Sequence, residues 1–416
     1  MQVGFAEAEI SPRNGLTAMS GYGFPRYARG VTSPLKLQAS VIVDDAGARL
    51  ALIAADLLGF DRSSTEAVRR ALAADGFAPE RVMLNASHTH YGPPVQFNLT
   101  SSVGSVDPWY VLELEKTAVE TVRRALAAAA DREIRYGMFR IKIGENRRLP
   151  GKRGVVMSPN PAGFYDEASV FLWARPNRGR RGETVLLAHG CHPVFSRAEG
   201  YCADYPGEYR RGAEALRPGA RFVFLQGCGA DVNGPSKAQY AAEGERLGRE
   251  LIRCLTPEAT RPLQGAFSCA LARAALPLGR RLPRRELDRL AYRPPSPWMA
   301  AFARPLLQNP DTRRTLPYGV QAWRCGDFSI AALEGEVVSA YGPFTRRAAG
   351  GTCMVLGYSN AVECYIPTAR ILREGGNEAA GSCQSYRLPG TLGRTAPAVV
   401  EKTIRRALAA VEGKRR

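Results

Sequence analysis

The chain has little histidine and no long apolar run. Only four of its 416 residues are histidine. No segment reaches the roughly 20 consecutive apolar residues of a transmembrane helix. Residues 1–5 (MQVGF) lack the basic and apolar regions of a secretory signal. We therefore expect a protein that has no transmembrane segment and lies in the cytoplasm.

The nine cysteines form no disulfide framework. Their number is odd, they are scattered, and no CxxC pair occurs. Cys191, Cys228, Cys353 and Cys364 lie beside apolar runs, where a buried reduced thiol is expected. The chain also lacks a GxSxG motif, so a serine nucleophile of the α/β-hydrolase type has no support.

Acidic residues are fewer than basic ones, with 39 Asp and Glu against 57 Lys and Arg, so the net charge is +18. Such a charge can indicate nucleic acid or another anionic partner. The densest basic clusters are residues 175–181, 280–289 and 414–416, and none alternates with the aromatic side chains on which single strands stack. We expect a solvated arginine-rich surface and no specific nucleic-acid partner.

No linker and no internal repeat can be recognised, so we expect one large domain over residues 1–416. Residues 276–312 are rich in proline and arginine. They predict a short helix at 285–292, followed by an irregular excursion that contains Trp298, Met299 and Phe302. This excursion is either a lid over the active site or a surface loop that packs its own aromatic side chains.

Apolar strands and amphipathic helices alternate along the chain. The pattern predicts strands at 39–45, 49–54 and 81–86, and helices at 63–75 (capped by Ser63 or Ser64), 107–129 and 396–412. The strands are continuously apolar, which is typical of strands buried on both faces. We therefore predict an α/β fold with a mixed, largely buried sheet flanked by helices.

Five apolar strands from distant parts of the chain end in turns that carry polar side chains. The strands and the residues that follow them are 81–86 with His88 and His90, 184–188 with His189 and His192, 221–226 with Asp231 and Asn233, 328–333 with Glu334 and Glu336, and 352–357 with Tyr358 and Tyr365. A buried sheet brings such ends together. We expect the active site at this rim of strand carboxyl ends.

The stretch Arg81–Pro94 (RVMLNASHTHYGPP) illustrates the pattern. Residues two apart on a strand point to the same face, so we expect the imidazoles of His88 and His90 to project together. The alternative is a hydrogen-bonded surface turn that happens to contain two histidines.

Histidines from two strand ends, together with a carboxylate, form the minimal ligand set of a catalytic zinc. His88, His192 and Glu336 fit this set, with Tyr365 as a fourth ligand. The alternative is metal-free catalysis by a serine or cysteine nucleophile. Asp56 and Asp204 either orient ligand histidines or cap turns, and we expect His189 to be a hydrogen-bonded core residue rather than a ligand.

A series of short motifs occurs in order along almost the whole chain. They are Ile10-Ser11-Pro12, Gly21-Tyr22-Gly23, Ser87-His88-Thr89-His90-Tyr91-Gly92-Pro93, Asn146-Arg147, His192-Pro193-Val194 with the later Asp204, Asp231-Val232-Asn233, Glu334-Gly335-Glu336 and Cys364-Tyr365-Ile366-Pro367-Thr368. Together they resemble the catalytic domain of the neutral/alkaline (non-lysosomal) ceramidase family.

The resemblance implies a zinc-dependent amidohydrolase whose substrate is a small-molecule amide. The zinc ligands it implies are His88, His192, Glu336 and Tyr365. His90 and Arg147 would lie beside the reacting amide. Water activated by zinc would attack the carbonyl, Arg147 would stabilise the oxyanion, and His90 or Tyr365 would handle the proton. The alternative for Arg147 is a surface ion pair with Glu145.

Three departures from the family pattern bear on the substrate. Asn233 replaces a serine that contacts the ceramide headgroup, and Glu334 replaces a proline. The signal peptide and the C-terminal β-sandwich domain of the secreted relatives are not recognisable. We therefore expect a substrate other than ceramide, smaller and more polar, with Asn233 in the binding site. Acyl transfer on the same site and a catalytically silent metal-binding relative remain as alternatives.

Overall fold

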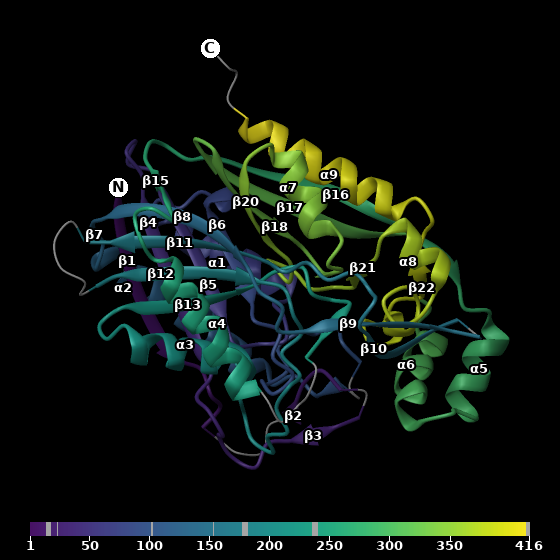
Figure 1. Ribbon diagram of the computed structural model, residues 1–416. Coiled ribbons are helices and arrows are strands. Elements are labelled where there is room, and N and C mark those ends of the chain that lie inside the picture. The colour runs from purple at the N-terminus through teal and green to yellow at the C-terminus, as the bar shows by residue number, and fades with distance from the viewer. Residues whose placement is uncertain are drawn as a thin grey trace.

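The structure is a computed structural model that describes residues 1–13, 18–22, 24–100, 103–152, 154–176, 182–234 and 240–412. Gly23, residues 177–181 of one basic cluster and the basic tail 414–416 lie outside the described residues. Strands and helices are mixed throughout (Figure 1), so the predicted α/β class is confirmed. The main strands are divided among three sheets rather than gathered in one.

Each of these sheets has five strands. The first sheet has the order β6 (Val82–Ala86), β5 (Arg49–Ala55), β4 (Lys36–Val43), β1 (Gln2–Glu9) and β7 (Ala130–Asp131). The second has the order β13 (Arg221–Gln226), β12 (Thr184–His189), β11 (Ala168–Arg175), β8 (Glu133–Arg140) and β15 (Arg261–Leu263). The third has the order β20 (Thr352–Leu356), β18 (Phe328–Leu333), β17 (Thr315–Cys325), β16 (Ser268–Arg281) and β22 (Gly390–Leu392).

The three sheets repeat one topology. In each, three strands pair antiparallel in succession, a helix follows, and a fourth strand pairs parallel with the third. A helix is the usual connection between parallel strands, and here these helices are α1 (Arg62–Ala73), α3 (Asp204–Leu216) and α7 (Tyr341–Ala349). The chain therefore contains a threefold structural repeat that we did not recognise in the sequence.

The sheets pack around a shared apolar core, because successive strand residues point to opposite faces. One face of each sheet contributes to this central core; examples are Leu52 and Met83, Leu186 and Leu225, and Ile330 and Met354. A pair of helices packs on the other face of each sheet: α1 with α2 (Pro108–Ala127), α3 with α4 (Tyr240–Cys254), and α7 with α9 (Ala396–Val411). Burial on both faces explains the continuous apolar runs.

One buried asparagine joins the three sheets where their parallel strands end. The Asn85 Nδ2 of β6 donates to the carbonyl oxygens of Gln226 on β13 (3.2 Å) and of Gly357 after β20 (2.8 Å). The Gln226 amide donates in turn to Asn85 Oδ1 at 2.7 Å. The strand ends of all three sheets therefore meet at one rim, as predicted.

The predicted helices are present, with two corrections. α1 is capped by Asp61, whose carboxylate accepts from the Ser63 amide, and not by Ser63 or Ser64. The predicted helix at 285–292 is α5 (Arg284–Tyr292), and β16 extends to Arg281 before it. The irregular excursion expected after this helix is wrong, because α6 (Pro297–Gln308) follows instead. We expected a loop because this region is rich in proline. Pro297, however, is the first residue of α6, where its missing N–H costs no helical hydrogen bond.

Smaller elements surround the rim. They are the hairpin of β2 (Ala18–Met19) and β3 (Arg26–Tyr27), the ribbon of β9 (Glu145–Gly151), β10 (Gly154–Asn160) and β14 (Val232–Asn233), the parallel pair β19 (Glu336–Val337) and β21 (Tyr365–Ile366), and helix α8 (Ala369–Glu374). In Figure 1, β9, β10, α5 and α6 extend from the sheets on one side.

All nine cysteines are free thiols, and the four that we expected to be buried are buried. Within the described ranges, no helix combines the length and the apolar content that a bilayer crossing requires.

Candidate functional site

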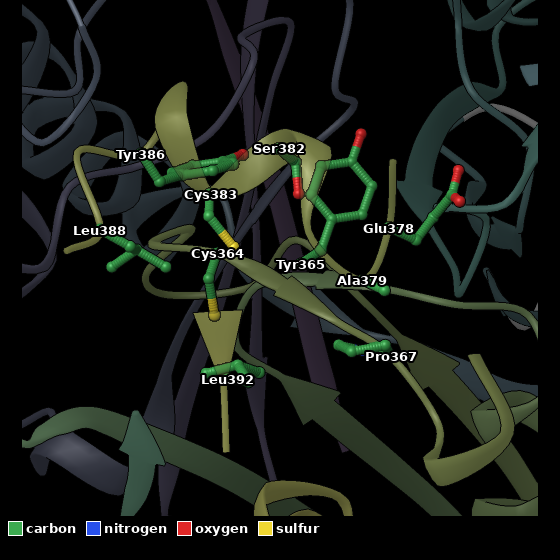
Figure 2. Close-up of a pocket in the computed structure, with 10 residues that line it drawn as sticks. All are labelled: Cys364, Tyr365, Pro367, Glu378, Ala379, Ser382, Cys383, Tyr386, Leu388 and Leu392. Carbon is green, nitrogen blue, oxygen red and sulfur yellow. The ribbon is translucent and has the colours of Figure 1, made fainter. Parts of the chain in front are cut away.

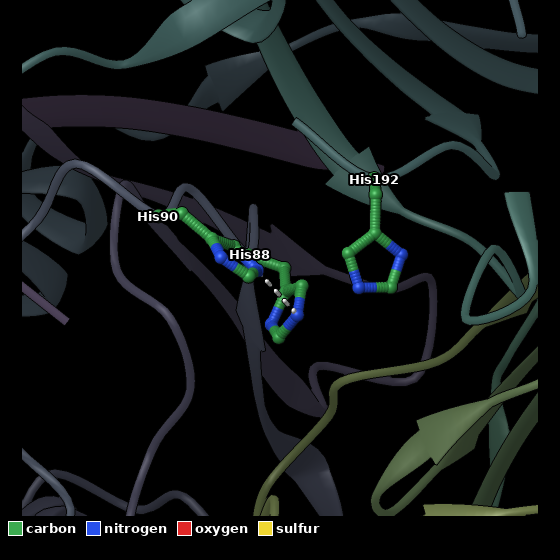
Figure 3. Close-up of side chains that lie close together, drawn as sticks. All are labelled: His88, His90 and His192. Carbon is green, nitrogen blue, oxygen red and sulfur yellow. Dashed lines mark hydrogen bonds between the residues drawn. The ribbon is translucent and has the colours of Figure 1, made fainter. Parts of the chain in front are cut away.

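His88 and His90 lie in a turn and not on the strand before them. β6 ends at Ala86, and His88 has a left-handed backbone with φ 67°, which is uncommon for a residue other than glycine. The expectation that a shared strand face aligns the two imidazoles is therefore wrong. The turn still brings them together, with His90 Nε2 at 3.4 Å from His88 Nε2 (Figure 3).

Backbone carbonyls determine which nitrogen of two histidines faces the site. His88 Nδ1 lies 2.6 Å from the Leu58 carbonyl oxygen, and His192 Nδ1 lies 2.9 Å from that of Gly229. A carbonyl can only accept, so each Nδ1 carries the hydrogen. Each Nε2 therefore presents a lone pair, which is the arrangement of histidines that bind a metal.

Glu336 completes a convergent set of acceptor atoms. Its Oε2 lies 3.2 Å from His88 Nε2 and 3.4 Å from His192 Nε2. The hydroxyl of Tyr386 donates to Oε1 of the same carboxylate. Within the described chain, the buried His192 Nε2 and Glu336 Oε2 have no hydrogen-bond partner. Lone pairs that face one another in a buried site fit a cation, so these residues fit a zinc ion.

His90 extends this set to three imidazoles. Ligand nitrogens of His88, His90 and His192 all lie within 4.8 Å of one another. Figure 3 shows the three rings converging from two separate segments. The structure thus offers two overlapping ligand sets: the three histidines, and the predicted pair of histidines with Glu336.

The protonation states suit a metal. Burial, followed by the charges of His88 and His192, lowers the pKa of His90 well below its usual range. Burial and then Arg147 lower the pKa of His192 to about 4. Burial would raise the pKa of Glu336, but His88 and His192 outweigh it and hold that pKa well below its usual range. The neutral forms of His90 and His192 and the ionised form of Glu336, which these shifts favour, are the forms that bind metal.

Arg147 and Tyr365 lie beside this set. Residue Glu336 of β19 pairs in register with Tyr365 of β21, which brings Tyr365 beside the carboxylate. Arg147 is 5% exposed and donates from Nη2 to the Tyr365 hydroxyl (3.0 Å) and from Nη1 to Asn233 Oδ1 (3.1 Å). The alternative of a surface pair with Glu145 is therefore wrong.

A cavity of about 630 Å³ opens onto these residues. Its apolar lining includes Leu58, Leu99, Val103, Met157, Val194, Trp298 and Met299. Its polar lining includes Tyr22, His88, His90, Arg147, Asn233, Glu336, Tyr365, Asn377, Gln384 and Tyr386. Every predicted site residue except the buried His192 lines it, and His192 lies close to two of the lining residues, His88 and Glu336.

No protein-family model and no curated protein matches the chain. Solved structures do match it, among them two ceramidases. A ceramidase complexed with C2 has a TM-score of 0.77 and 17% identity, covering 99% of this chain and 76% of the other. The neutral ceramidase of Pseudomonas aeruginosa has a TM-score of 0.75 and 18% identity, covering 98% and 74%. The chain has a ceramidase-like fold. The fold that the motifs implied is therefore confirmed.

Within the ceramidase-like fold, the secondary residues have structural roles. Asp56 pairs with Arg210, at 3.0 Å and 2.5 Å, and contacts no site histidine. Asp204 accepts hydrogen bonds from the Ser196 and Tyr205 amides, so it caps a turn, which was the second of our two expectations for it.

His189 is buried between the hydroxyls of Tyr165 (2.6 Å) and Ser169 (2.8 Å), which confirms it as a core histidine. Glu334 forms an ion pair with Arg62 at 2.7 Å, so the charge of this extra carboxylate is paired.

Sequence reasoning missed the wall of the site that segment 375–388 forms in this ceramidase-like fold. Figure 2 shows Tyr386 and Glu378 of this segment around Tyr365. Glu378 is 3% exposed and contacts Arg147. No apolar period or motif marks this irregular segment. Its place in the site follows from contacts with residues more than 200 positions earlier in the chain.

Proposed function

We propose that the protein is a zinc-dependent hydrolase of a carbon–nitrogen (amide) bond. The observation that carries this proposal is the convergence of His88 Nε2, His192 Nε2 and Glu336 Oε2 at the base of the cavity. The hydrogens of both imidazoles are already held by carbonyls. Tyr365 is the proposed fourth ligand.

Zinc bound there would lower the pKa of a coordinated water towards about 7 and so supply hydroxide at neutral pH. The chain's own residues would do the rest. The Nη1 and Nη2 hydrogens of Arg147 lie at the cavity wall, where they can stabilise a developing oxyanion. His90 lies in the same cluster, where its imidazole can take up a proton from the attacking water and release it to the leaving amine. Tyr365 is the second candidate for that transfer.

We further propose that the substrate is a small-molecule amide other than ceramide. Carboxamides (Asn233, Asn377 and Gln384) and apolar side chains both line the cavity. Such a mixed lining suits an amide with an apolar acyl group and a polar amine part. Asn233 stands where the family has a serine, which supports a changed headgroup. The free thiols support a reducing, cytoplasmic location.

The test is release of carboxylic acid from a panel of N-acyl amines with acyl chains of different length, including a long-chain ceramide. We expect zinc-dependent release that a chelator abolishes and zinc restores. Full activity in the metal-free protein would contradict the mechanism, and rapid hydrolysis of the ceramide would contradict the proposed substrate. Amide formation from added acid and amine would instead favour acyl transfer. Bound zinc without turnover on any amide would favour a silent relative.

A further inference from the structure

A buried carboxylate outside the predicted site contacts both arginines of β9. Glu378 lies between α8 and β22 and is 3% exposed. Its Oε1 accepts from Arg147 Nε at 2.9 Å, and its Oε2 accepts from Arg148 Nη1 at 2.5 Å. Both oxygens of one carboxylate are thus used on two neighbouring guanidinium groups.

The contact with Nε determines where the rest of the Arg147 guanidinium points. The group is planar and its donors form a rigid fork, so fixing one edge fixes the others. With Nε held by Glu378, Nη1 and Nη2 are directed to Asn233 and Tyr365 at the cavity. Loss of the Nε contact would leave only the contacts to Asn233 and Tyr365 to resist rotation about the last bond of the side chain.

Arg148 secures the segment that carries Glu378. Its Nη2 donates to the Gly375 carbonyl oxygen at 3.0 Å and to Glu374 Oε2 at 3.2 Å. Eight residues beyond Glu378, the Tyr386 hydroxyl donates to Glu336. The segment is therefore held on β9 at one end and on the candidate metal ligand at the other.

We propose that Glu378 is a positioning residue, which holds the Arg147 guanidinium where Nη1 and Nη2, beside Asn233 and Tyr365, meet the developing oxyanion. The inference rests on the proposed amide hydrolysis and adds a residue to it. The competing explanation is that Glu378 only neutralises two buried arginines, as any buried counter-charge would.

Glu378→Asp separates these explanations, because it keeps the charge but withdraws the carboxylate by one methylene. If Glu378 positions Arg147, kcat falls about 10- to 100-fold, the scale of a 1 Å misplacement at a reacting group. KM then changes little, because the contact is made mainly in the transition state. A variant with wild-type kcat overturns the proposal.

The matched control is Glu374→Gln, which removes another carboxylate from Arg148 but does not touch Arg147. We expect its kcat to lie within about twofold of wild type, the effect of losing a partly exposed ion pair. A double-mutant cycle adds a second control. In an Arg147→Ala background, Glu378→Asp should cause no further fall in kcat. An equal fall in both backgrounds overturns the proposal.

A crystal structure of zinc-loaded Glu378→Asp tests the positioning without any turnover. We expect the Arg147 guanidinium to have turned away from Asn233 and Tyr365. An unmoved guanidinium overturns the proposal even if the protein is an amidase. A displaced one upholds the positioning even if the wild-type protein hydrolyses no amide, so the two failures are distinguishable.

Discussion

Two carbonyl oxygens decide which nitrogen of His88 and His192 can bind a metal. Leu58 and Gly229 each hold an Nδ1 hydrogen, so Nε2 of both rings faces Glu336. The site therefore depends on individual atoms as much as on residue types. Three predictions belong to this scale.

His88→Ala or His192→Ala should lose both zinc and activity, because each removes a ligand that the remaining side chains cannot replace. We expect about one zinc per wild-type chain and none in the variants, measured by metal analysis after extensive dialysis. The control is His189→Gln, since His189 is hydrogen-bonded in the core. Zinc retained in His88→Ala would show that the ligand set is wrong.

Arg147→Ala should keep zinc and the fold but lower kcat by roughly 100- to 1,000-fold, the usual effect of losing one oxyanion donor. Arg147→Lys should restore only part of kcat, because an ammonium cannot reproduce the planar fork. Steady-state kinetics of the zinc-loaded variants measure both effects. A near-normal kcat in Arg147→Ala would show that Arg147 does not stabilise the transition state.

His189 should make the protein sensitive to mild acid. Burial and then the charge of Arg246 lower its pKa to about 3, so the folded state stays neutral while the unfolded state takes up a proton below its ordinary pKa of 6.5. The stabilisation is therefore present above pH 6.5 and is lost as the pH falls towards 3.

Between pH 7 and pH 5 the loss should be about 2 kcal/mol of unfolding free energy. Urea unfolding at the two pH values measures it. His189→Gln should show a smaller difference between the two, since glutamine does not titrate and only the other histidines still contribute. An equal difference in both proteins would contradict the assignment.

At the scale of elements, the three parallel strand pairs bring the site together. β6, β12 and β18 precede His88, His192 and Glu336 respectively, and each belongs to a different sheet. The Asn85 side chain joins the ends of the neighbouring strands. The position of the site therefore depends on this junction.

Asn85→Leu should lower the unfolding free energy by about 2–4 kcal/mol, because it leaves several buried backbone groups without partners. Urea unfolding at neutral pH measures the change. The control is Asn309→Leu at the exposed end of α6, which we expect to change stability by no more than about 0.5 kcal/mol. An equal loss of unfolding free energy in the two variants would show that the Asn85 hydrogen bonds do not stabilise the fold.

At the scale of the whole molecule, each of the candidate metal ligands His88, His192 and Glu336 follows a strand of a different sheet. An ion held by His88, His192 and Glu336 would bind the folded chain and not the unfolded one. Zinc at 100 times its dissociation constant should then add about 2.7 kcal/mol to the unfolding free energy.

Thermal unfolding with zinc and with a chelator measures this linkage. We expect a higher Tm with zinc in the wild-type protein and no shift in His88→Ala. A shift of the same size in that variant would place the stabilising ion elsewhere.

The sequence alone determined part of the elements and the chemical types at their ends. Apolar runs identified β4, β5, β6, β12, β13, β18 and β20 but not β1, β8, β11, β16 or β17. Helical periods identified α2 and α9, because such signals depend only on near neighbours in the chain. His88, His192, Glu336 and Tyr365 could be chosen for the same reason, since each follows an apolar run.

Only the tertiary structure decided the threefold arrangement of sheets, the tautomers of the histidines and the roles of Glu378 and Tyr386. These depend on contacts between residues far apart in sequence; Glu378 and Arg147, for example, are separated by 231 positions. No local period records such a contact, because distant partners are brought together by the packing of whole sheets. The proline-rich α6 was missed for a related reason, since its helix is stabilised by packing on α5 rather than by local preference.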